Sequence, residues 1–135
     1  MILLDTGYLI ALADRRDSLH RRALAWARVI REPRVVTDYV LLETVNYFSR
    51  IADRSRGHTL VQHIRNQPGS ILVPASAELF AAGLKLHAAR ADKEWSLTDC
   101  ISFHVMLELR ITRALAYDVH FEQAGYEALL RRDPP

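Results

Sequence analysis

Four acidic residues of this chain could together do chemistry that none of them could do alone. They are Asp5, Glu43, Asp99 and Asp118. Carboxylates held within a few ångströms repel one another, so the pKa of each rises unless a cation neutralises the site. Mg2+ and Mn2+ suit such a site, because both accept oxygen ligands and leave positions open for water. One or two such ions can bind a phosphodiester, activate a water molecule and stabilise the leaving oxygen.

The segments around these acids indicate how they would come together. Asp5 directly follows the apolar run at residues 2–4, and Asp118 follows a second run at residues 114–117. The other two acids lie near the beginnings of predicted helices. In open parallel sheets, ligands bind beyond the carboxyl ends of the strands, where the strand order reverses. Acids spread over most of the chain would therefore meet at one edge of the sheet.

Apolar patterning predicts a regular alternation of strands and helices. Strands are expected at residues 2–4, 34–37, 71–73 and 113–117. Helices are expected at residues 7–13, 18–31, 40–51, 55–66, 76–91, 98–109 and 121–130, with Asp17 or Ser18 capping the second and Ser76 the fifth. This order predicts an α/β protein of three layers, α/β/α, in which helices cover both faces of a mostly parallel sheet.

Composition and length limit the class of protein. The chain has 135 residues, 50% of them hydrophobic and 25% charged, and no linker divides it, so residues 1–135 are expected to form a single domain. No apolar run reaches the roughly 20 residues that cross a bilayer, and Asp5 and Asp14 interrupt any signal-peptide pattern. The single Cys100 cannot form an internal disulfide, and no Cys/His set has zinc spacing. We therefore expect a cytoplasmic protein without a membrane partner.

Each acid also has an explanation that needs no metal. Asp99 completes a capping box that begins at Ser96, and Asp5 could cap the first helix. Glu43 could be a solvated helix residue, and Asp118 an acid of an ordinary turn. Position alone leaves both explanations open.

Four short motifs, taken in order, resemble those of the PIN-domain proteins. They are Ile2-Leu3-Leu4-Asp5-Thr6-Gly7, the segment 40–46 around Glu43, the segment 96–103 around Asp99, and the segment 117–126 that begins Tyr117-Asp118. The subgroup that the chain resembles is the VapC-type toxin of bacterial and archaeal toxin–antitoxin pairs. The similarity runs from residue 2 to about residue 130.

The resemblance implies a hydrolase: a metal-dependent ribonuclease that cuts RNA. It implies that the four acids bind Mg2+ or Mn2+, directly or through water, with Asp5 and Asp99 anchoring the ion. The hydroxyls of Thr6 and Thr98 would hold these carboxylates in place. Ala116 departs from the family pattern, since relatives often carry Ser or Thr two residues before the last acid, and Gly7 is a smaller departure.

The resemblance also implies partners: an RNA substrate, a small antitoxin whose C-terminal segment blocks the groove, and a second copy of the chain in a homodimer. The residues themselves suggest an RNA-binding set, because arginines can hold phosphates beside the acids. These are Arg15, Arg16, Arg50, Arg54 and Arg56. Trp26 is expected in the core. Trp95 is the better candidate for stacking on a base, although packing is favoured there too.

Two other protein classes of similar architecture fail on specific residues. A phosphorelay receiver domain needs a second acid beside Asp5 and a lysine at a strand end, whereas Lys85 and Lys93 lie in helical or loop segments. A haloacid-dehalogenase-type phosphatase needs Asp-x-Asp after the first strand, whereas this chain has Gly7 at the third position. A PIN fold that binds RNA or protein without cutting it remains the alternative.

Overall fold

A five-stranded sheet forms the centre of the molecule. The structure is a computed structural model that describes residues 1–135. The strands are β1 (Ile2–Leu4), β2 (Arg34–Thr37), β3 (Ser70–Val73), β4 (Arg113–Leu115) and β5 (Glu127–Ala128). Their order across the sheet is β3-β2-β1-β4-β5, and every neighbouring pair is parallel. The chain moves outward on one side through β2 and β3 and then returns to the other side for β4. The strand order therefore reverses between β1 and β4.

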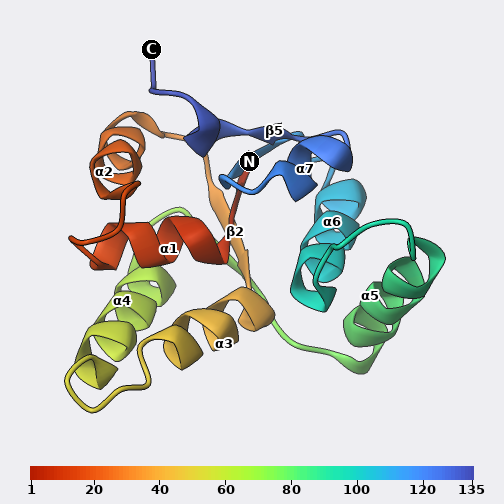
Figure 1. Ribbon diagram of the computed structural model, residues 1–135, viewed down its shortest axis with the longest axis horizontal. Coiled ribbons are helices and arrows are strands. Elements are labelled where there is room, and N and C mark those ends of the chain that lie inside the picture. Colours follow the sequence, from red (N-terminus) through yellow and green to blue (C-terminus); the bar gives the residue numbers. More distant parts are fainter.

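Helices cover both faces of this sheet, as expected for a three-layer α/β/α protein (Figure 1). They are α1 (Thr6–Ala13), α2 (His20–Val29), α3 (Asp38–Tyr47), α4 (Arg54–Asn66), α5 (Ala77–Ala89), α6 (Leu97–Leu109) and α7 (Val119–Gln123), followed by the 3-10 helix η1 (Leu129–Arg131). None of them is both long and apolar enough to cross a membrane.

Strand alternation divides the hydrophobic core into two clusters. In β1, Ile2 and Leu4 face the cluster formed with α1 to α4, whereas Leu3 faces the cluster formed with α5, α6 and α7. Val36 and Val35 of β2 divide in the same way. All five side chains are almost fully buried, which is typical of strands covered on both faces. The apolar runs of the sequence are therefore continuous because neither face of the sheet meets water.

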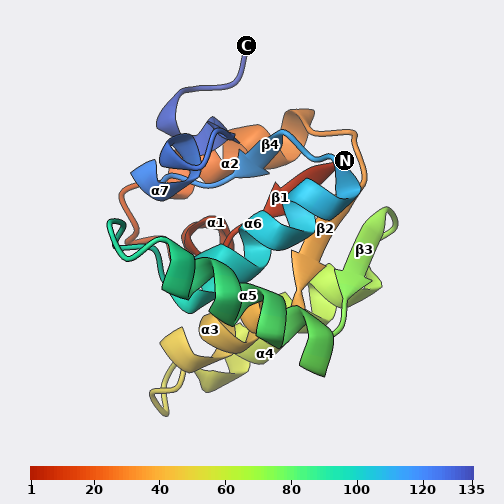
Figure 2. The same cartoon turned by 90° about the vertical axis from the view of Figure 1, so that its right-hand side faces the viewer.

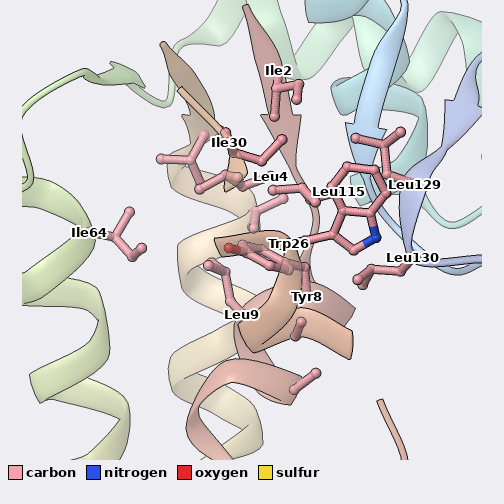
Figure 3. Close-up of a cluster of buried hydrophobic side chains, with 14 of the residues drawn as sticks. Ile2, Leu4, Tyr8, Leu9, Trp26, Ile30, Ile64, Leu115, Leu129 and Leu130 are labelled. Carbon is pink, nitrogen blue, oxygen red and sulfur yellow. The ribbon is translucent and has the colours of Figure 1, made fainter. Parts of the chain in front are cut away.

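The first cluster also ties the C-terminal segment to the body of the protein (Figure 3). Leu129 and Leu130 of η1 are fully buried against β4 and Trp26. The Trp26 indole Nε1 donates a 2.9 Å hydrogen bond to the carbonyl of Arg132. Trp26 therefore lies in the core, as the sequence predicted, and satisfies its one polar atom at the chain end.

In the second cluster, α5 packs against α6 (Figure 2). A Cβ atom on Gly83 of α5 would lie 2.3 Å from Cγ1 of Ile101 on α6, which no real contact allows. Because α6 is apolar nearly all round, it is well buried, as predicted. This contact helps to fix the helix that carries Asp99.

The C-terminal prediction was wrong. The sequence predicted one helix over residues 121–130, but α7 ends at Gln123 and the chain then forms β5 and η1. Gly125 adopts a φ of +92°, a left-handed conformation that ends the helix and turns the chain back to the sheet. The fifth strand has only two residues, too few to give an apolar run of its own.

Two smaller predictions also differ from the structure. The α2 helix begins at His20 with Leu19 as its N-cap residue, so neither Asp17 nor Ser18 caps it. The Asp17 carboxylate instead accepts a 2.8 Å hydrogen bond from the Leu19 backbone N–H in the preceding turn. The α3 helix ends at Tyr47 rather than Ile51. Ser76 caps α5 as predicted, since its hydroxyl accepts from the Leu79 N–H.

Candidate active site

The carboxyl ends of β1 and β4 form the floor of the site. Asp5 follows β1 directly, and its backbone N–H donates to the carbonyl of Leu115, the last residue of β4. Asp118 follows three residues later on the chain from β4 and is the N-cap of α7. Both acids therefore lie where the strand order reverses, the position where open parallel sheets bind ligands.

All four predicted acids line one cavity of about 740 Å³. Its lining residues are Asp5, Thr6, Gly7, Asp17, Leu19, Glu43, Glu94, Ser96, Asp99, Tyr117, Asp118, Val119, His120 and Arg131. The fold thus brings together residues from four motifs that are separated by up to 113 positions in the sequence, from Asp5 to Asp118. Six carboxylates give this cavity a strongly acidic character.

Asp5 is the buried acid of the cavity, with 9% of its surface exposed. Desolvation by burial, together with the charges of Asp99 and Glu43, raises the pKa of Asp5 to about 7. The nearby backbone N–H groups of Thr6 and Gly7 partly oppose this rise in pKa, although the Asp5 side chain makes no capping hydrogen bond to α1. The N–H groups come from the first turn of α1, which favours a negative charge at that point. A cation beside Asp5 would offset the cost of its burial.

Glu43 is held by the first residue of α1. The Thr6 hydroxyl donates a 2.6 Å hydrogen bond to Glu43 Oε1, which links α1 to α3 across the cavity. The Glu43 Oε2 atom has no hydrogen-bond partner in the structure. Thr6 therefore orients one oxygen of Glu43 and leaves the other free. Thr98, by contrast, makes no side-chain hydrogen bond to any of the acids.

Asp99 has the capping role that the sequence predicted and also lines the acidic cavity. It completes the capping box of α6, because its Oδ2 accepts from the Ser96 N–H at 3.1 Å and its own N–H donates to the Ser96 hydroxyl. The same oxygen lies 2.9 Å from Nδ1 of His120 on α7. The carboxylate thus caps a helix and faces the acidic cavity at once.

Asp118 is the most exposed of the four acids, with 49% of its side chain accessible to solvent. Its Oδ1 accepts from the His120 N–H at 3.1 Å and lies 3.3 Å from the His120 ring Nδ1. Ala116, two residues before it, is fully buried and gives no polar support. His120 therefore bridges Asp99 and Asp118, a contact that sequence spacing alone did not reveal.

The arrangement of the carboxylates is open rather than tight. No group of three or more His, Cys, Asp or Glu side chains lies close enough together to hold a metal ion as the side chains stand. Their chemistry nevertheless suits a hard divalent cation, because every acidic donor is a carboxylate oxygen and one of them is buried.

The five predicted RNA-binding arginines do not line the acidic cavity. Three of them, Arg15, Arg16 and Arg56, line a separate polar cavity with Asp14 and Asp53. The cation that does line the acidic cavity is Arg131. Arg131 was not among the predicted site residues, because residues 121–130 were expected to form one helix and the return of the chain to the sheet was not foreseen.

The remaining aromatic candidate is a packing residue. Trp95 is 5% exposed, packs edge-on against Phe103 and donates from Nε1 to Gln123 Oε1 at 2.9 Å. It is therefore unavailable to stack on a base, as the preferred interpretation of the sequence expected. Tyr117 and Val119 also line the cavity, and their positions beside Asp118 could have suggested this. His120 lines it too, as its position two residues after Asp118 predicts.

This fold is shared with solved structures, among them the following two. One is VapC20 from Mycobacterium tuberculosis, described as a toxin that cleaves the sarcin–ricin loop; it matches with a TM-score of 0.86 and 24% identity over 93% of this chain and 96% of that one. The other is FitAcB from Neisseria gonorrhoeae, with a TM-score of 0.65 and 18% identity over 95% of each chain. At these identities the likeness establishes the fold.

Family membership comes from the sequence. No curated protein sequence matches the chain. A model of the PIN domain, however, matches residues 2–126, which include all four acids of the cavity and both strands that meet there. The chain belongs to the PIN domain family.

Proposed function

We propose that this protein is an endoribonuclease that uses Mg2+ or Mn2+ to hydrolyse RNA phosphodiester bonds, and that it is the toxin of a toxin–antitoxin pair. The observation that carries the proposal is the buried Asp5 carboxyl, with its pKa near 7, facing Glu43, Asp99 and Asp118 in one cavity. Likeness to a toxin described as cleaving the sarcin–ricin loop supports RNA as the substrate class.

The donor set supports a divalent metal ion as the cofactor. Burial and the neighbouring carboxylates disfavour the ionised form of Asp5, and an ion bound there would remove that penalty. Asp5 and Asp99 would anchor the ion, with Glu43 and Asp118 contributing directly or through water. When bound, the ion supplies positive charge that holds the phosphodiester and lowers the pKa of water.

The protein's own residues would then orient the reactants. Thr6 fixes Oε1 of Glu43, so that its free Oε2 can accept a hydrogen bond from the attacking water. The capping box and His120 hold Asp99 from two sides, and His120 also restrains Asp118. Hydrolysis by water directed in this way needs no covalent enzyme intermediate. The hydroxyl of Thr98 remains a proposed support for the carboxylates.

A test of this function compares purified protein, free of any antitoxin, on a panel of structured and single-stranded RNAs with Mg2+, Mn2+ or EDTA. The Asp99→Asn variant is run in parallel, because the amide oxygen of Asn can still accept the hydrogen bond from the Ser96 N–H while the charge is lost. Cleavage that requires both metal and Asp99 would support the proposal. Cleavage that persists in EDTA or in the variant would contradict it.

The second candidate function is a PIN-fold module that binds RNA or protein without cutting. It is favoured by one observation, namely that no three carboxylates lie in a metal-binding arrangement as the side chains stand. The same RNA panel separates the two, since a binding module would retain RNA without releasing shorter products in any metal.

We also propose that the protein forms a homodimer, binds a small antitoxin and works in the cytoplasm. Large apolar side chains exposed on α3, α5 and α6 support a protein interface. They are Leu42, Tyr47, Phe80, Leu84 and Leu107. Light scattering after size exclusion tests the dimer, and a monomer at micromolar concentration that remains monomeric at tenfold higher concentration would contradict it.

The five arginines Arg15, Arg16, Arg50, Arg54 and Arg56 stay proposed contacts to the RNA backbone beyond the cavity.

A further inference from the structure

Arg131 is the only permanently charged cation among the residues that line the acidic cavity. Six carboxylates surround the space that an RNA phosphate has to enter. Their repulsion toward a polyanion is long-ranged at low salt, so a fixed positive group at the rim has a large effect on where the phosphates can lie. Arg131 also lies beyond residue 126, where the match to the PIN domain model ends.

The guanidinium of Arg131 is held in one place by Tyr117 and Glu122. It lies over the Tyr117 ring, with 5.0 Å between Cζ and the ring centroid. Its Nη1 donates a 2.8 Å hydrogen bond to the Tyr117 carbonyl, and its Nε lies 2.7 Å from Glu122 Oε1. The Nη2 group has no partner, and 39% of the side chain is exposed. The Nη2 group of Arg131 can therefore donate a hydrogen bond to a ligand from a fixed position.

The backbone next to this pair is anchored in the core. Leu130, next to Arg131, is fully buried and its N–H donates to the Ala116 carbonyl at 3.0 Å. Ala116, next to Tyr117, is also fully buried. Two core residues that are hydrogen-bonded to each other thus position the two exposed side chains, which reduces the entropy lost when a ligand binds them.

Tyr117 lies immediately before Asp118 and exposes to solvent the part of its ring that the Arg131 guanidinium does not cover. It is 45% exposed, and its hydroxyl makes no hydrogen bond within the protein. A large aromatic ring left half open at the rim of a polar cavity is the kind of surface on which single-stranded RNA bases stack. The Tyr117 hydroxyl makes no hydrogen bond that would account for the exposed position of the side chain, so we consider the ring as a surface for a base.

We propose that Tyr117 and Arg131 form a subsite for one nucleotide next to the phosphodiester that is cut. The base stacks on Tyr117, and the phosphate of that nucleotide accepts a hydrogen bond from the guanidinium of Arg131. This subsite rests on the proposed function of the acidic cavity. Glu122 limits the strength of the phosphate contact, because its carboxylate already neutralises part of the Arg131 charge.

The neighbouring pair of Arg132 and Glu127 provides a matched control. Arg132 also forms an ion pair with a glutamate, lies in the same exposed segment and carries the same charge, but it does not line the acidic cavity. A purely structural role of the C-terminal ion pairs predicts that Arg131 and Arg132 behave alike. A nucleotide subsite predicts that only Arg131 changes RNA binding.

The test measures binding of a fluorescein-labelled single-stranded RNA of mixed sequence by anisotropy in Mg2+, with Asp99→Asn in every protein so that bound RNA is not cut. Tyr117→Ala should weaken binding about tenfold, whereas Tyr117→Phe should stay within twofold of the parent. Arg131→Gln should weaken binding and reduce the slope of log affinity against log salt by about 0.7, the value for one phosphate contact on a single strand. Arg132→Gln should change neither quantity.

Two further measurements separate a subsite from general loss of structure. Glu122→Gln should tighten binding, since it frees the Arg131 charge, whereas a structural ion pair predicts no gain. An abasic RNA backbone of equal length should bind the parent and the Tyr117→Ala protein equally. The parent should also bind abasic RNA more weakly than the ordinary RNA, and this second comparison needs no variant.

Equal affinity of the parent, Tyr117→Ala and Arg131→Gln proteins for the RNA would overturn the subsite, and so would an equal loss in Arg132→Gln. Cleavage of the same RNA by the protein with Asp99 intact reports on the proposed function separately. Cleavage with no effect of Tyr117 or Arg131 rejects the subsite alone. Binding that depends on both residues without any cleavage keeps the nucleotide-binding pair but favours the non-cleaving RNA-binding module over the nuclease.

Discussion

Asp5 is the most buried acid of the cavity, and its burial makes the stability of the folded protein depend on pH. Its pKa is about 7 in the folded protein, against 3.8 for an aspartate in water. A carboxyl whose pKa is higher in the folded than in the unfolded chain binds its proton more strongly when folded. Its contribution to stability is therefore complete below about pH 4 and is lost as the pH rises through about 7.

Replacing Asp5 with Asn should stabilise the metal-free protein at pH 8, because the variant carries no buried charge there. The gain in free energy of unfolding should be on the order of 1–3 kcal/mol and should shrink toward zero as the pH falls to 4. Urea unfolding in EDTA at a series of pH values measures it. Asp118→Asn, at an exposed helix cap, is the control and should change stability little. A gain for Asp5→Asn that does not vary with pH would contradict the explanation.

The hydrogen bond from Thr6 to Glu43 gives a prediction for activity. Thr6→Val keeps the shape of the side chain but removes the hydroxyl that fixes Glu43 Oε1. We expect kcat/KM for RNA cleavage to fall roughly tenfold, the lower end of effects seen for residues that orient metal ligands. Thr6→Ser restores the hydroxyl and should recover most of the activity. Full activity of Thr6→Val would show that Glu43 needs no such support.

At the scale of helices and strands, the contact between α5 and α6 determines where Asp99 lies. Gly83→Ala places a methyl group against Ile101 and Leu97, so we expect a loss of about 1–3 kcal/mol in the free energy of unfolding. Ile101→Ala removes the nearest clashing atom at the cost of a cavity. Chemical denaturation of both single variants and the double variant measures the coupling, and the double variant should be less destabilised than the sum. If the losses in free energy of unfolding of the two single variants simply add in the double variant, the contact between Gly83 and Ile101 does not determine the packing of α5 on α6.

The elements that sequence reasoning predicted well have strong local causes. Buried parallel strands produce runs such as Ile2-Leu3-Leu4, and a capping serine such as Ser76 marks a helix start directly. The end of the chain lacked such signals, because β5 has two residues and its position depends on pairing with β4. Gly125, with its positive φ, was the one local sign that a helix over residues 121–130 would break.

The site was predictable to the extent that it depends on strand ends. Asp5 and Asp118 could be placed at one edge of the sheet because each follows a predicted strand of a parallel sheet, and the structure brings them to one cavity with Glu43 and Asp99. The contacts among them could not be predicted, since the His120 bridge and the Thr6 hydrogen bond depend on side-chain packing between separate helices. Arg131 reaches the cavity only because η1 returns to β4, which no local pattern in the sequence shows.

For the whole molecule, a bound metal ion should couple the acidic cavity to global stability. An ion that binds the folded chain and not the unfolded one stabilises it by about 2.7 kcal/mol at one hundred times its Kd. We therefore expect Mn2+ at pH 7.5 to raise the Tm of the wild-type protein by several degrees, and chelation by EDTA to reverse the change. Differential scanning calorimetry measures both. The Asp5→Asn variant should show a much smaller rise, and an equal rise in the variant would place the binding elsewhere.

The location of the metal ion is the point on which the roles of all four acids depend. Anomalous diffraction from crystals of the protein soaked in Mn2+ measures it directly. We expect one strong peak in the acidic cavity, about 2 Å from carboxylate oxygens of Asp5 and Asp99. No peak in that cavity, in crystals where Mn2+ is visible at other sites, would contradict the assignment of these acids as a metal centre.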